Sequence, residues 1–225
     1  MKAFVIGDKN NPISVQAVKA CVASSNLDIK FVQQTCPETL KEHLENFPNL
    51  TWNYPLNYDK ATNLETGMTL TPYKVRSLSR IFACTISHAR LWRKCVELDE
   101  EIMILEHDAI FTREFTPFEW EGGALGLNDP RGATHSAMFY HEILQAQGKG
   151  VHEAPFVKPP LSMPQGLAGH SAYIIRPFAA EELLEKMKET GAWPNDALMC
   201  KQFFPWLRVV YPYFTRVQGV QSTTT

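Results

Sequence analysis

Hydrophobic positions near the N-terminus follow two spacings, one typical of buried strands and the other typical of amphipathic helices. The short apolar runs at 4–6 and 29–32 predict strands, and the segment 12–24, which opens with a proline, predicts a helix between them. A second helix is expected over 37–47. Strands that alternate with helices favour an α/β sheet, and such sheets bind ligands at the carboxyl ends of their strands.

The clearest helix and strand lie in the middle of the chain. Apolar residues recur at helical spacing over 77–98, and the run 102–105 follows as a buried strand. The segment 48–73 before them is rich in Pro, Asn and aromatic residues, which predicts a long loop of the kind that often carries function. The weak pattern at 120–168 predicts further loops that shape a pocket.

Regular spacing returns in the C-terminal quarter. A strand is expected at 171–175, a helix at 177–190, a short helix opening at 194–196, and a last strand at 207–211 that leads into a polar tail. Internal repeats and linkers are not evident, so a single domain over residues 1–225 is predicted.

Composition narrows the classes of function. The chain has 225 residues, with 22 Lys and Arg against 24 Asp and Glu, so a global positive field that would attract nucleic acid or an anionic membrane is excluded. The five cysteines form no C-x-x-C pair, which favours a reducing, cytoplasmic setting, in a bacterial cell or a phage-infected host. Neither a signal peptide nor an apolar run of the roughly 18 residues that span a bilayer is evident.

Two carboxylates emerge where an α/β sheet presents its ligands. Glu106 and Asp108 follow the strand 102–105 and can share one hard divalent cation such as Mn²⁺ or Mg²⁺, which takes oxygen ligands from carboxylates and substrate phosphates. The same spacing also fits acidic residues that only cap the next element. His107 lies between them, either as a further ligand or as a bystander.

A run of basic residues precedes these carboxylates. The segment 66–96 holds six Lys and Arg and no acidic residue, so a diphosphate could lie between the two groups. Arg76 and Arg80 are the better candidates because they lie at a helix start, where free N–H groups also favour anions. His88 lies on the apolar helical face, which fits a packed core histidine as well as a catalytic one.

The segment Ile81-Phe-Ala-Cys-Thr-Ile-Ser-His-Ala-Arg-Leu-Trp92, followed by Ile104-Leu-Glu-His-Asp-Ala109, resembles glycosyltransferase family 25. That family includes bacterial lipopolysaccharide glycosyltransferases and collagen galactosyltransferases. Its strand ends in Glu-Asp-Asp, and His107 replaces the middle acidic residue here. Weaker resemblances are Gly169 to Ile175 and the Pro-Asn-Asp element at 194–196.

The resemblance implies a GT-A-like fold with a mixed central sheet, a UDP-sugar donor, Mn²⁺ dependence and inversion at the anomeric carbon. Gly7 and Asp8 would line the uridine pocket, while Asp196 would act as general base or acceptor contact, or would only cap its helix. The tail at 218–224 either folds over the diphosphate, with Ser222 as a donor contact, or is a disordered end.

The acceptor stays open at this stage. A glycan hydroxyl is one class, and a hydroxymethylated DNA base in a phage setting is another, with Trp52, Tyr54 and Tyr58 contacting the strand. The rivals are a nucleotide- or sugar-binding module that has lost catalysis, motivated by His107, and a nucleotidyltransferase, which also needs carboxylates, a metal and a phosphate-binding helix.

Overall fold

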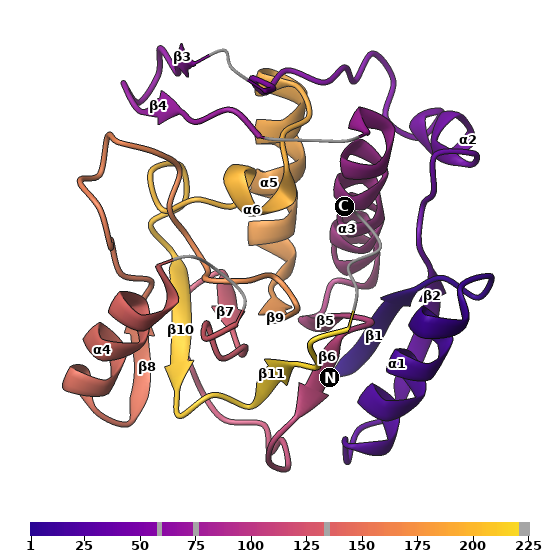
Figure 1. The fold of residues 1–225 in the computed structure, drawn as a ribbon, viewed down its shortest axis with the longest axis vertical. Coiled ribbons are helices and arrows are strands. Elements are labelled where there is room, and N and C mark those ends of the chain that lie inside the picture. The colour runs from indigo at the N-terminus through magenta and orange to yellow at the C-terminus, as the bar shows by residue number, and fades with distance from the viewer. Residues whose placement is uncertain (58–59, 74–76, 133–135, 221–225) are drawn as a thin grey trace.

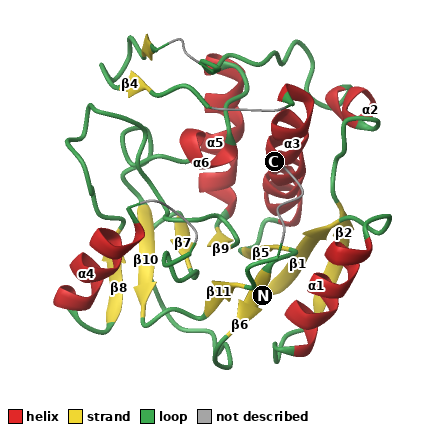
Figure 2. Ribbon diagram, viewed as in Figure 1, coloured by secondary structure: helices red, strands yellow, loops and turns green. Residues whose placement is uncertain are grey.

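A seven-stranded mixed sheet forms the centre of the computed structural model, which describes residues 1–57, 60–73, 77–132 and 136–220 (Figures 1 and 2). The strands, in the order in which they lie side by side, are β2 (Ile29–Gln33), β1 (Lys2–Gly7), β5 (Ile102–Glu106), β9 (Ala172–Ile175), β7 (Ala124–Gly126), β10 (Leu207–Tyr211) and β8 (Gly150–Glu153). Strands β2, β1 and β5 are parallel, and β9 runs antiparallel between β5 and β7.

Helices cover both faces of this sheet (Figure 1). They are α1 (Pro12–Ala23), α2 (Leu40–Leu44), α3 (Leu78–Leu98), α4 (Ala137–Gln147), α5 (Pro177–Thr190) and α6 (Asn195–Leu198). Side chains alternate along a strand, so Ile104 of β5 packs in the core that contains Trp92 of α3, and Leu105 packs in the core that contains Cys21 of α1. Because both faces are covered, β5 is a continuous apolar run.

Two short antiparallel ribbons flank the sheet. One pairs β3 (Ala61–Thr62) with β4 (Thr69–Leu70), and the other pairs β6 (Ala109–Phe111) with β11 (Thr215–Val217). The second ribbon carries the C-terminal segment back to the residues that follow β5 (Figure 1).

The architecture confirms the predicted α/β fold with a mixed central sheet. The strands and helices expected before residue 115 and after residue 170 are present, although α2 is shorter than the predicted helix 37–47. The Thr39 amide donates to the Cys36 carbonyl at 3.1 Å, so a turn occupies the start of that segment. None of the described helices is both long and apolar enough to cross a membrane.

The prediction that 120–168 forms only loops is wrong, because β7, α4 and β8 lie within it. Strand β7 has three residues and follows two glycines, which hides its pattern. Helix α4 exposes Met138 and Phe139, so its apolar positions do not form a single stripe. The loop 48–73 likewise contains β3 and β4.

Candidate active site

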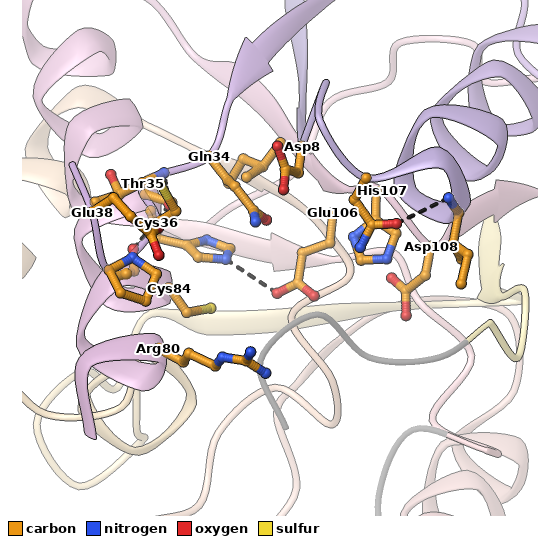
Figure 3. Close-up of a pocket in the computed structure, with 17 residues that line it drawn as sticks. Asp8, Gln34, Thr35, Cys36, Glu38, Arg80, Cys84, Glu106, His107 and Asp108 are labelled. Atoms are coloured by element: carbon orange, nitrogen blue, oxygen red, sulfur yellow. Dashed lines mark hydrogen bonds and ion pairs between the residues drawn. The ribbon is translucent and has the colours of Figure 1, made fainter. Parts of the chain in front are cut away.

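A pocket of about 350 Å³ lies at the carboxyl ends of the parallel strands (Figure 3). Ile6 of β1 lies opposite Glu106 of β5 in the sheet register, which brings the residues after both strands to one edge. Polar side chains from three strand ends line the pocket, namely Asp8 after β1, Gln34, Thr35 and Cys36 after β2, and Glu106, His107 and Asp108 at the end of β5.

Helix α3 forms the opposite wall. Arg80, Cys84, Ser87 and His88 all line the pocket, and their spacing places them on one face of the helix. The Ser87 hydroxyl accepts from the Thr35 amide at 2.8 Å, which ties this wall to the end of β2. The pocket thus places acidic residues at the strand ends opposite a positively charged side chain on the helix. Figure 3 shows this for Arg80, which faces Glu106.

Asp8 is held in place at the end of β1. Its Oδ1 accepts from Gln33 Nε2 at 3.0 Å and from the Asn10 amide at 3.0 Å. Gly7 is not among the residues that line the pocket, and its contact with the uridine stays a prediction. A Cβ there would lie 2.7 Å from Val18 Cγ2, so this glycine lets α1 pack closely against the sheet.

Glu106 and His88 form a close pair. His88 Nε2 lies 3.1 Å from Glu106 Oε1, and the side chains are 1% and 30% exposed respectively. Burial alone raises the pKa of Glu106, but the hydrogen bond with His88 outweighs it and holds the pKa below its ordinary value. Glu106 is therefore an ionised carboxylate at neutral pH.

Asp108 has the opposite electrostatic setting. Burial, followed by the negative charge of Glu106, raises the pKa of Asp108 to about 7. Its Oδ1 is buried and has no hydrogen-bond partner within the described residues. An unpaired buried carboxylate oxygen beside a second carboxylate is the donor set that a hard divalent cation takes, so these residues fit the predicted metal.

His107 lines the pocket but is only 7% exposed, and its Nε2 also lacks a partner within the described part of the chain. Burial lowers its pKa, which favours the neutral imidazole. Among the described residues, Cys84, His88 and Glu106, rather than the predicted trio of Glu106, His107 and Asp108, place their ligand atoms within 4.8 Å of one another.

Two of the predicted donor contacts, Arg76 and Ser222, lie outside the described residues. Arg80 does line the pocket. The C-terminal segment reaches the site through Gln218, whose backbone N–H donates to the Asp108 carbonyl at 2.8 Å. The Gln218 side-chain nitrogen donates to the carbonyls of His107 and Ala109 at 3.3 and 3.0 Å, so this segment holds the turn that carries Asp108.

Asp196 lies beside the pocket rather than in its wall. It is the second residue of α6, and Pro194 occupies the N-cap position of that helix. Its Oδ2 accepts from the Tyr73 hydroxyl at 3.3 Å. The preceding residue, Asn195, accepts from Cys84 Sγ at 3.8 Å, which connects α6 to the pocket wall.

The residues that suggested a DNA acceptor are used within the protein. Tyr54 is 6% exposed and packs edge-on against Trp193, and the Trp52 indole donates to the Tyr54 carbonyl at 2.9 Å. Arg93 pairs with Glu97 on the same helix. Tyr58 lies outside the described residues. Buried Tyr54 therefore offers no free surface on which a base could stack.

Sequence reasoning missed the residues that follow β2 and the thiol on α3. These are Gln34, Thr35, Cys36, Glu38 and Cys84. The rule that identified Asp8 and Glu106, that ligands bind at the carboxyl ends of parallel strands, applies equally to the end of β2. Helical spacing from Arg80 could likewise have identified Cys84.

A comparison of the sequence with models of protein families identifies the kind of protein to which this pocket belongs. The model of glycosyltransferase family 25, described as an LPS biosynthesis protein, matches residues 2–120. The chain belongs to glycosyltransferase family 25. Membership makes it a glycosyltransferase, and the matched residues include β1, β2, α3 and the Glu106 to Asp108 turn, which together form the walls of the pocket.

Solved structures similar to this family 25 chain are also glycosyltransferases. Mouse xyloside xylosyltransferase 1 matches with a TM-score of 0.45 and 11% identity, covering 92% of this chain and 83% of its own. The bifunctional glycosyltransferase WbbM matches at 0.44 and 13%, covering 94% and 38%. The galactosyltransferase LgtC, solved with donor and acceptor sugar analogues, matches at 0.39 and 12%, covering 93% and 72%. No curated protein sequence matches the chain significantly.

Proposed function

We propose that this family 25 enzyme transfers a sugar from a UDP-sugar to a hydroxyl group of a glycan, with a divalent cation and with inversion at the anomeric carbon. The observation that carries the proposal is the pocket in which Glu106 and Asp108 face Arg80 across the carboxyl ends of parallel strands. This combination suits a nucleoside diphosphate, because carboxylates hold its cation and a guanidinium pairs with its phosphates.

The nucleoside would occupy the part of the pocket formed by the ends of β1 and β2. Asp8 is fixed there by Gln33, and Gln34 and Thr35 lie at the adjoining strand end. These groups offer hydrogen-bond acceptors and donors for a ribose or a pyrimidine edge. The diphosphate would then extend toward Arg80.

Glu106 and Asp108 would hold Mn²⁺ or Mg²⁺. When bound, such a cation neutralises charge on the departing diphosphate. Within the chain itself, the raised pKa of Asp108, about 7, means that proton loss from Asp108 prepares the site for a cation and a donor. Arg80 supplies a positive charge that keeps the diphosphate in place.

Asp196 is the proposed base for a direct displacement. Its carboxylate accepts a hydrogen bond from Tyr73 and stands next to Asn195, which contacts the pocket residue Cys84. A carboxylate in this place can take the proton of an acceptor hydroxyl as that hydroxyl attacks the anomeric carbon. His88 is not assigned this role, because both of its ring nitrogens already have partners.

A panel of UDP-sugars, each with and without Mn²⁺, tests the proposal by thermal shift and by release of UDP. One UDP-sugar is expected to stabilise the protein only with the metal and to be hydrolysed slowly to UDP. Release of pyrophosphate from a nucleoside triphosphate and a sugar phosphate would instead identify a nucleotidyltransferase, and binding without any turnover would identify a module that has lost catalysis.

Two arginines of α3 give a matched pair of variants. Arg80→Gln removes the cation in the pocket and is expected to raise the KM for the UDP-sugar about tenfold, the size of effect typical of a hydrogen bond to a charged group. Arg93→Gln removes an arginine that pairs with Glu97 outside the pocket, and should leave KM unchanged. Equal effects of the two variants would contradict the assigned donor position.

A further inference from the structure

A chain of hydrogen bonds runs from the core of the sheet to the pocket. The Trp92 indole Nε1 donates to the Tyr173 hydroxyl at 2.9 Å, this hydroxyl lies 2.9 Å from His88 Nδ1, and His88 Nε2 lies 3.1 Å from Glu106 Oε1. Trp92 and Tyr173 are fully buried, and His88 is 1% exposed. The arrangement leaves little freedom in where each proton lies.

The donor at one end fixes the direction of every hydrogen bond in this series. An indole N–H can only donate, so the Tyr173 oxygen must accept from Trp92. Among the described residues, His88 Nδ1 is the remaining partner of this hydroxyl, and a buried hydroxyl proton without an acceptor is costly. Tyr173 therefore donates to Nδ1, which must keep its lone pair, and the ring proton of His88 lies on Nε2.

We infer that Trp92 and Tyr173 fix the proton of His88 on Nε2, so that His88 is a positioning residue that donates to Glu106 and holds its carboxylate in the pocket. This inference rests on the proposed function for the role of Glu106, and on hydrogen-bond geometry alone for the state of His88. It also separates His88 from the cluster with Cys84, since a protonated Nε2 is not a metal ligand.

As a consequence, the two carboxylate oxygens of Glu106 have different partners. Oε1 accepts from His88, while the other oxygen stays available to the contents of the pocket. A carboxylate held in this way keeps one rotamer and loses less conformational freedom when it binds a ligand. Rotation of the carboxylate away from the pocket would cost the hydrogen bond from His88.

The state of His88 can be measured directly on the 225-residue chain with ¹⁵N-labelled histidine. Long-range ¹H–¹⁵N correlation spectra distinguish the two neutral tautomers, and the His88 signal among the seven histidines is identified by its loss in His88→Gln. We expect Nε2 to be protonated and Nδ1 to be free. A neutral His88 with its proton on Nδ1 would overturn the inference, whatever the enzyme transfers.

Tyr173→Phe removes the hydroxyl and keeps the buried ring. His88 should then populate both tautomers, and the Mn²⁺ concentration for half-maximal UDP release should rise roughly 3- to 10-fold, the effect typical of one lost hydrogen bond. An unchanged tautomer together with an unchanged metal response would overturn the inference.

Two replacements of His88 provide the matched comparison. The glutamine amide nitrogen lies about as far along the side chain as Nε2, whereas that of asparagine lies about as far as Nδ1. His88→Gln should therefore retain several-fold more UDP release than His88→Asn, because only glutamine restores a donor to Glu106. The reverse order would contradict a donor role at Nε2. If the wild-type protein released no UDP from any donor, the proposed function would be wrong. The spectra would still test the hydrogen bonds of His88, because they do not depend on activity.

Discussion

His170 should make the stability of this enzyme depend on pH in the mildly acidic range. The side chain is 5% exposed, packs edge-on against Tyr173 at 5.8 Å between ring centroids, and has no hydrogen-bond partner on either ring nitrogen within the described residues. Burial lowers the pKa of His170 from 6.5 to about 3. The folded protein therefore keeps this ring neutral where the unfolded chain protonates it.

The sign and size of this change in the free energy of unfolding with pH follow from proton linkage. Because the unfolded state binds the proton more tightly, the full stability is present above pH 6.5 and is lost as the pH falls toward 3. At pH 5 the unfolded chain is almost fully protonated at this position and the folded protein is not. The free energy of unfolding should then be lower than at pH 7.5 by about 2 kcal/mol from His170 alone.

Urea unfolding at pH 7.5 and pH 5 measures this loss. Other histidines also titrate, so the informative quantity is the difference between wild type and His170→Leu, which removes the titrating ring and its two unpaired nitrogens. The variant should lose about 2 kcal/mol less between the two pH values. An equal loss in both proteins would refute the assignment of a strongly lowered pKa to His170.

Two further perturbations test packing and the C-terminal segment. Gly123→Ala should destabilise the fold by about 1–3 kcal/mol in urea unfolding, because the new Cβ would lie 2.6 Å from the Trp206 ring; unchanged stability would show that the ring moves freely. Gln218→Ala should speed amide hydrogen exchange over 107–111 and weaken UDP-sugar binding, since the side chain bonds the His107 and Ala109 carbonyls. Unchanged exchange there would contradict a bracing role for Gln218.

Much of the fold could be predicted because its central elements have strong local patterns. Helix α3 keeps one apolar face over 21 residues, and β5 is a continuous apolar run, so both were located within a residue or two. Helix α4 and strands β7 and β8 were missed because their burial depends on partners distant in sequence. Strand β8, for example, pairs with β10 more than fifty residues later.

The candidate site was predicted in outline for a similar reason. Residues at the ends of apolar strands, such as Asp8 and Glu106, follow from the rule for ligand binding in α/β sheets. The partners of His88 do not, because Tyr173 lies 85 positions away in sequence and only the antiparallel pairing of β5 with β9 brings it close. The bracing of the Asp108 turn by Gln218 is equally a tertiary effect.

The most direct test of the proposed chemistry is UDP release from a UDP-sugar as a function of Mn²⁺ concentration in wild type, Asp108→Asn and Asp28→Asn. Asp28 is exposed and precedes β2, at the end of the strand away from the pocket, so its variant controls for loss of one surface charge. We predict that Asp28→Asn matches wild type and that Asp108→Asn loses its response to Mn²⁺ and at least about 99% of its UDP release. Full release with an unchanged metal response in Asp108→Asn would contradict the account.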